Sequence, residues 1–247
     1  MIPSTVPTGA GRAYGEAMTD LTSHVVVVSP HLDDAVLSCG QLIGQLDDCV
    51  VLTVFAGSPG SWEIHRLWDH DFCGFAEGTD VLAARLREDD AALTSLGAGA
   101  ARLSFLDEQY RDSGMEPSPE EVGELIAAGI DRIGAATILM PLGLGHNDHR
   151  LTAAGCRHAA STHPHLQWFA YQDLPYGYEP ELFGPHAVDE ALRWLSPLAP
   201  RPMELGTESG AQAKSAALDH YPSQMRGLGD RRQAAMKPER YWKLEPH

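Results

Sequence analysis

The stretch that decides the fold is Val25-Val26-Val27-Val28-Ser29-Pro30-His31-Leu32-Asp33-Asp34, an apolar run that leads directly into one imidazole and two adjacent carboxylates. Open α/β sheets bind their ligands in the crevice outside the C-terminal ends of the strands, so polar side chains at this point indicate a functional site. A second apolar run, residues 136–142, leads into Gly143-Leu144-Gly145-His146-Asn147-Asp148-His149. If the two runs are neighbouring strands, the polar groups that follow them converge on one site.

Short apolar runs alternate with helical patterns along most of the chain. This alternation predicts strands at 24–30, 49–56, 101–106, 136–141 and 167–172, and helices at about 34–46, 79–97, 119–134 and 149–162. Ser118, Pro119 and Glu121 predict the start of the third helix, as an N-cap, a proline and the glutamate of a capping box. Such a pattern implies right-handed crossovers and a mainly parallel sheet covered on both faces. We therefore expect an α/β fold, a Rossmann-like three-layer sandwich with strand order 3-2-1-4-5.

The remaining segments have weaker patterns. Residues 1–23 lack the apolar region of a signal peptide, so we expect a flexible N-terminal tail on a cytoplasmic protein, with residues 24–247 forming a single domain. The loop 57–78 is expected to wall a substrate pocket, because long loops inside compact domains are usually functional. Beyond residue 172 the chain is Pro-rich until a helical segment near 208–226, and a basic tail then follows that should pack against the acidic body.

The composition argues against several classes of function. The chain has 247 residues and a formal net charge of −16, which repels the phosphates of nucleic acids and anionic lipid surfaces. No apolar stretch approaches the roughly 18 residues of a membrane span. The four cysteines are widely spaced, which disfavours a thiolate zinc cluster or a disulfide framework. The two strand ends also lack the dinucleotide-binding G-x-G-x-x-G pattern, and no G-x-S-x-G nucleophile elbow occurs.

The polar groups at the two strand ends have the residue types of a metal site. Two histidines and one carboxylate satisfy zinc and leave a position open for water. His31 and Asp34 lie one helical turn apart at a helix entry and can face the same point, together with one of the later histidines. Asp33 then points elsewhere in the pocket and could accept a proton from the attacking water. The alternative is that Asp33 and Asp34 only cap the helix that begins there.

At these residues the chain resembles the PIG-L/LmbE-like family of metal-dependent N-acetylglucosaminyl deacetylases. The family pattern is an H-P-D-D-E motif at a strand end, followed much later by H-x-x-H, and the resemblance covers most of residues 24–226. It implies that His31, Asp34 and His149 hold the metal. It further implies that Asp33 is the general base, and that His146 polarises the carbonyl or protonates the leaving amine.

Two further segments are similar to family motifs. Arg85-Leu86-Arg87-Glu88 resembles the family's R-x-x-E helix, which implies that Arg85 reaches the substrate pocket. The late segment with Lys214, Ala217, Ser223 and Gln224 resembles a K-x-x-A…S-Q pattern.

The chain departs from the family pattern at two positions. Leu32 replaces a proline, which should affect only the turn. Ala35 replaces a glutamate that could bind substrate or orient the base, and this leaves the acceptor sugar open.

These features predict a zinc-dependent hydrolase, with Fe²⁺ as the alternative metal in the cell. It would remove an acyl group, with acetyl the first candidate, from the amide of an amino sugar or amino-sugar conjugate in natural-product metabolism. Arg85, Trp68, Tyr110 and Asp173 are expected to bind this small-molecule substrate. The alternatives are an amidase of the mycothiol-conjugate type, a non-catalytic metabolite-binding member of the fold, and a transferase that uses no metal. No nucleic acid or membrane partner is expected, and the oligomeric state stays open.

Overall fold

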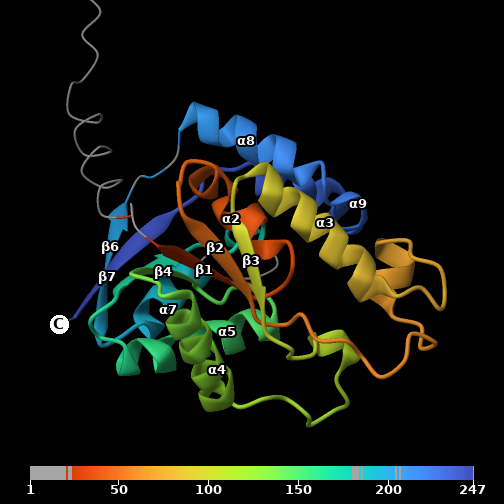
Figure 1. Cartoon of the computed structure of the whole chain (residues 1–247), viewed down its shortest axis with the longest axis horizontal. Coiled ribbons are helices and arrows are strands. Elements are labelled where there is room, and N and C mark those ends of the chain that lie inside the picture. Colours follow the sequence, from red (N-terminus) through yellow and green to blue (C-terminus); the bar gives the residue numbers. More distant parts are fainter. Residues whose placement is uncertain are drawn as a thin grey trace, which may run out of the picture.

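A computed structural model describes residues 21, 24–179, 184, 186–203, 205 and 207–246 (Figure 1). The expected N-terminal tail, residues 1–23, therefore lies outside the described residues except for Leu21, which is buried. The strands are β1 (Val25–Ser29), β2 (Cys49–Thr53), β3 (Gly99–Arg102), β4 (Thr137–Pro141), β5 (Gln167–Tyr171), β6 (Leu198–Met203) and β7 (Tyr241–Pro246).

Helices connect and cover these strands. The α-helices are α2 (Asp34–Ile43), α3 (Val81–Ser95), α4 (Pro119–Ile133), α5 (Asn147–Thr162), α7 (Ala187–Trp194), α8 (Glu208–Leu218), α9 (Pro222–Leu228) and α10 (Arg232–Ala235). The short helical turns are η1 (Leu67–Phe72), η2 (Glu108–Tyr110), η3 (Tyr176–Tyr178) and η4 (Gly229–Arg231). Among the described residues, no helix combines the length and apolar character needed to cross a bilayer.

The seven strands form one sheet with the order β3-β2-β1-β4-β5-β7-β6. The first five strands are parallel, which confirms the predicted order 3-2-1-4-5. The sequence pattern did not predict β7, which is antiparallel to β5, or β6, which is antiparallel to β7. Pro200 and Pro202 make the sequence of β6 look like a loop. They are tolerated because β6 is an edge strand, which can lack backbone hydrogen-bond donors.

The central strand β1 is buried on both faces, which explains its unbroken run of valines. Val25 and Val27 pack in a cluster with side chains of α2, α8 and α9, and Val26 and Val28 pack in a second cluster with α4 and α5. Figure 1 shows these helices on opposite sides of the sheet, with α2, α3 and α8 on one side and α4 and α5 on the other. The result is the predicted three-layer fold.

The structure confirms one local prediction and shifts or divides others. Ser118 and Glu121 form the predicted capping box of α4. The helical segment expected near 208–226 is two helices, because Pro222 begins α9 after the turn that ends α8. The strand expected at 101–106 is β3, which lies slightly earlier, and the loop 57–78 contains the π-helix η1. The four cysteines are free and buried.

Candidate active site

The site lies where the C-terminal ends of β1 and β4 meet. These strands are parallel neighbours, so the segments that follow them leave the sheet at the same edge. The turn after β4 depends on glycine: Gly143 and Gly145 have φ of 85° and 80°, in the left-handed region. A Cβ on Gly145 would also lie 2.6 Å from the Tyr176 ring. This turn leads directly into α5, which begins with the second group of polar residues.

The three residues predicted as metal ligands come together in the structure. His31, Asp34 and His149 are buried, and each offers a ligand atom within 4.8 Å of those of the other two. Asp34 Oδ2 lies 3.0 Å from His31 Nδ1 and 3.1 Å from His149 Nε2. The same oxygen accepts the backbone N–H of His31 at 2.9 Å. One carboxylate oxygen therefore faces both imidazoles.

The hydrogen bonds of Asp173 orient His149. Asp173 Oδ1 lies 2.6 Å from His149 Nδ1, and its Oδ2 accepts the backbone N–H groups of Gly143 and Leu144. We therefore assign the proton to Nδ1, which leaves the Nε2 lone pair directed at Asp34. This Nε2 is buried and has no hydrogen-bond partner among the described residues. Two acceptor atoms that face one another in a buried site need a positive charge between them. A second proton on the His149 ring supplies it when no metal is bound, and a divalent metal fits the same position.

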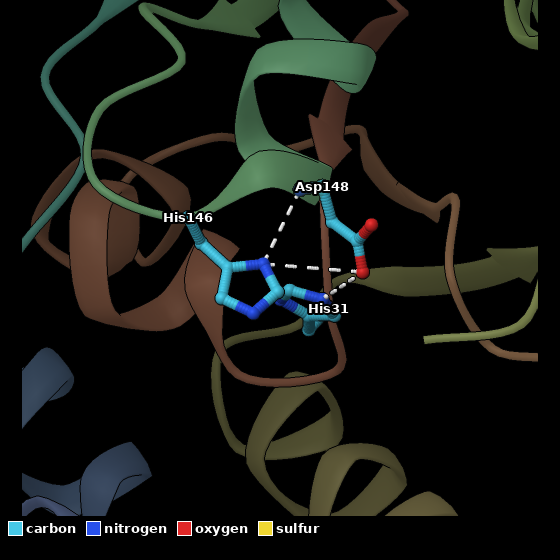
Figure 2. Close-up of side chains that lie close together, drawn as sticks. All are labelled: His31, His146 and Asp148. Atoms are coloured by element: carbon cyan, nitrogen blue, oxygen red, sulfur yellow. Dashed lines mark hydrogen bonds and ion pairs between the residues drawn. The ribbon is translucent and has the colours of Figure 1, made fainter. Parts of the chain in front are cut away.

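Asp148 holds the other side of His31 (Figure 2). Asp148 Oδ2 lies 3.0 Å from His31 Nε2 and accepts the backbone N–H of Glu108, while Oδ1 pairs with Arg111. His31, His146 and Asp148 also bring potential ligand atoms within 4.8 Å. Because both oxygens of Asp148 already have partners, the cluster of His31, Asp34 and His149 is the stronger candidate for a metal, and Asp148 orients the His31 ring.

Asp33 occupies the N-cap position of α2, but its side chain makes no capping hydrogen bond. The side chain lines the cavity, and Arg85 and His31 are nearby positive charges. Burial, followed by the negative charge of Asp34, raises the pKa of Asp33 to about 6. The capping alternative thus does not describe Asp33, whose carboxylate remains available to accept a proton.

His146 is the N-cap of α5, and its Nδ1 accepts the backbone N–H of Asp148 at 3.2 Å (Figure 2). The ring proton therefore belongs on Nε2, which lies 3.2 Å from Glu108 Oε2. Burial, followed by the positive charge on His31, lowers the pKa of His146 to about 4. The side chain is one-third exposed and lines the cavity, so a neutral imidazole presents an N–H there.

A cavity of about 320 Å³ adjoins these residues. Of the residues predicted to bind substrate, Arg85 and Trp68 line it. Tyr110 and Asp173 are not among its lining residues in the described part of the chain: the Tyr110 hydroxyl donates to Asp69, and Asp173 orients His149. Ala35, in the first turn of α2, packs in the core. The side chain that replaces the family glutamate therefore does not line the cavity either.

Several lining residues had no recognisable signal in the sequence. They are Asp107, Gln109, Tyr176, Leu228 and Arg231. Gln224 also lines the cavity, and only its place in the late S-Q segment had marked it. Arg85 is buried and lies 3.6 Å from Asp107, and its Nε has no hydrogen-bond partner among the described residues. Arg85 therefore brings a positive charge to the wall of the cavity.

Residues 26–160 match the family described as PIG-L, GlcNAc-PI de-N-acetylase. The chain belongs to the PIG-L family. It is 29% identical over 236 residues to a 2'-N-acetylparomamine deacetylase of Niallia circulans, an alignment that covers 81% of this chain and 80% of that protein. It is 32% identical over 190 residues to a 2'-N-acetylparomamine deacetylase of Streptomyces fradiae, with coverage of 70% and 65%.

The fold is shared with solved deacetylases. The crystal structure of the A40926 pseudoaglycone deacetylase Dbv21 superposes with a TM-score of 0.73 at 28% identity, covering 91% of this PIG-L chain and 98% of that chain. These matches confirm the predicted family and the predicted fold. The relatives of this PIG-L protein are deacetylases that act on amino-sugar natural products.

Proposed function

We propose that this PIG-L protein is a zinc-dependent hydrolase that removes an acetyl group from the amide nitrogen of an amino sugar or amino-sugar conjugate in natural-product metabolism. The observation that carries the proposal is the buried His149 Nε2 directed at Asp34, with His31 beside it and the uncapped Asp33 next in sequence. The 2'-N-acetylparomamine deacetylases support this class of substrate.

His31, Asp34 and His149 would hold the metal. Two imidazole nitrogens and one carboxylate oxygen suit Zn²⁺, and Fe²⁺ accepts the same donors. When bound, the divalent ion would polarise the amide carbonyl and make water a stronger acid. Asp173 and Asp148 fix the two imidazole rings, so the ligand atoms keep their directions.

Asp33 transfers the proton in this proposal. Its carboxylate accepts a proton from the attacking water as the oxygen bonds to the amide carbon. The same carboxyl group then gives that proton to the amine nitrogen as the carbon–nitrogen bond breaks, so acetate and a free amine leave. A pKa of about 6 suits a group that must accept and then return a proton near neutral pH.

His146 stabilises the charge on the carbonyl oxygen. Because its Nδ1 accepts the Asp148 backbone N–H, the Nε2–H is the group that can donate toward a substrate, whose carbonyl oxygen would replace the half-exposed Glu108 carboxylate as its acceptor. Of the two roles that the resemblance leaves open, polarising the carbonyl is the one that this geometry favours.

The test is product detection by mass spectrometry on the zinc-loaded protein. The panel contains N-acetylglucosamine, 2'-N-acetylparomamine, an N-acetylated thiol conjugate of an amino sugar and an N-acetylated glycopeptide. We expect acetate and the matching free amine from at least one member. Tight binding without turnover would instead support the non-catalytic alternative, and full activity after chelation would support the metal-free transferase.

A further inference from the structure

A second cavity lies between α5 and α7, on the side of the sheet that α4 also covers (Figure 1). Its volume is about 430 Å³, compared with about 320 Å³ for the cavity of the candidate active site. Pockets that bind small organic molecules have volumes of roughly 300–1,000 Å³. Gly145 is the only described residue that lines both cavities. The second cavity is therefore a separate place for a ligand.

This cavity forms where two helix faces meet through small side chains. Positions 150, 153, 154 and 157 of α5 line one wall, and positions 187, 190, 191 and 194 of α7 line the other. Each set has the i, i+3, i+4, i+7 spacing of a single helix face. Positions 153, 154, 187 and 191 all hold alanine, whose methyl group is too short to fill the space between two helices. The sequences of both helices thus account for the cavity.

The charged residues that line the cavity have a positive balance. They are Arg150, Arg157 and Glu190, in a chain whose net charge is −16. Arg157 donates to the Ser196 carbonyl at 3.1 Å, and in the described part of the chain neither Arg150 nor Glu190 forms an ion pair. The exposed Glu190 offsets only one of the two positive charges. The cavity therefore favours an anionic group.

Trp194 adds an aromatic surface at one end of the cavity. It lines the wall and is nevertheless 73% exposed. Arg157 donates to Ser196, two positions beyond Trp194, so the indole ring and this guanidinium belong to the same end. Arg150 lies two helical turns away from Arg157, about 10 Å along the axis of α5. An aromatic ring that stacks on the indole would thus bring an acidic substituent close to an arginine.

We propose that the cavity between α5 and α7 binds a small organic anion with an aromatic ring, of the aromatic carboxylic acid type. The ring would lie on Trp194 and over the alanines, and the acidic group would pair with the arginines. A second copy of the chain is the weaker occupant, because it would carry the same net charge of −16. This inference does not depend on the proposed deacetylase function.

The test is calorimetry on the full, zinc-loaded chain with 2-naphthoate and with its neutral amide, 2-naphthamide. We expect the carboxylate to bind at least about tenfold more tightly, because hydrogen bonds between charged partners are stronger than neutral ones. The double variant Arg150→Gln/Arg157→Gln should bind the two compounds alike. Ala154→Leu, which places a larger side chain in the cavity, should weaken the binding of both.

Two control variants examine the active site as the alternative place for the acid. Arg231→Gln removes an arginine that lines the active-site cavity, and His149→Ala removes a candidate metal ligand. Both should keep the preference for naphthoate. If either lost it while Arg150→Gln/Arg157→Gln kept it, the acid would lie in the active site and the inference would be overturned. Equal affinity of the wild type for the two compounds would overturn it as well.

Trp194→Ala gives an independent test, because it alters α7 and not α5. It should weaken the binding of both compounds, and circular dichroism shows whether each variant is folded. Sedimentation of the wild type and of Trp194→Ala examines the second copy as occupant. Self-association that Trp194→Ala abolishes, in a protein that does not bind naphthoate, would assign this face to an interface between copies and overturn the inference.

Discussion

At the scale of single residues, the site is an arrangement of buried acceptors around two imidazoles. Asp34 faces both rings, Asp148 holds His31, and Asp173 holds His149. Burial alone would lower the pKa of His149, but the carboxylates of Asp34 and Asp173 outweigh burial and raise the pKa to about 9. The surroundings therefore favour positive charge at this position, whether it comes from a ring proton or from a metal ion.

In the proposed function, Asp33 is the residue whose replacement distinguishes a catalyst from a protein that only binds metal. Asp33→Asn keeps the size of the side chain and cannot accept the proton, so we expect the rate to fall by roughly 10²–10⁴. Folding should be unaffected, because the side chain makes no capping bond and asparagine is as good an N-cap. Turnover and metal content are measured on one preparation. A loss of rate below about threefold with full metal content would remove Asp33 from the mechanism.

Asp173 should control metal affinity without touching the metal. In Asp173→Ala, His149 loses the acceptor that fixes its tautomer and ring orientation, so we expect about 10- to 100-fold weaker zinc binding. Competition with a fluorescent chelator measures this affinity. Asp131→Ala is the control, since it also removes a carboxylate from a histidine, the exposed pair with His163. Equal zinc affinity in both variants would refute the orienting role.

At the scale of elements, a buried ion pair ties α2, which carries Asp34, to the C-terminal part of the chain. Lys214 and Glu239 are fully buried and lie 2.8 Å apart. Lys214 Nζ donates to the carbonyl of Leu37 in α2, and Glu239 accepts the backbone N–H groups of Gln41 and Leu42. Gly40 provides the room, because a Cβ there would lie 2.8 Å from Lys214 Cγ.

This ion pair gives a prediction about stability. Lys214→Met leaves the Glu239 carboxylate buried without its cation, and we expect a loss of about 3–5 kcal/mol in the free energy of unfolding. The double variant Lys214→Met/Glu239→Gln removes both charges and should recover part of that loss. Urea denaturation of the two variants and the wild type measures the difference. A double variant that is no more stable than the single one would show that the isolated charge is not the cause.

The elements also show what the sequence could and could not reveal. Strands β1 and β4 and the start of α4 were predictable, because burial on both faces and helix capping leave local patterns. Strand β6 was not predicted because prolines such as those it contains are typical of loops. Strand β7 was not predicted because it follows a basic segment and was assigned with that segment to a tail. The strand order predicted that residues 31–34 would meet residues 146–149, and the family resemblance singled out His149 as the third member of the cluster with His31 and Asp34. The part played by Asp173 depends on a contact across 24 positions, which no local pattern marks.

At the scale of the whole molecule, the two core clusters lie on either side of the sheet, and the candidate metal ligands lie at its edge. The fold should therefore survive removal of the metal, although its stability should fall. Metal that binds only the native state at 100 times its Kd adds about 2.7 kcal/mol. For a chain of this size that shifts Tm by about 5–10 °C.

Chelation followed by reloading measures this coupling. We expect a chelator to abolish deacetylation and to lower Tm while far-UV circular dichroism stays unchanged, and Zn²⁺ to restore both activity and Tm. In His149→Ala, added Zn²⁺ should leave Tm unchanged, because two remaining ligands cannot hold the ion in a fixed geometry. Asp33→Asn should keep the full shift in Tm and regain no activity. If instead His149→Ala kept the shift and His146→Ala lost it, the metal would lie in the cluster of His31, His146 and Asp148, and the ligand assignment would have to be reversed.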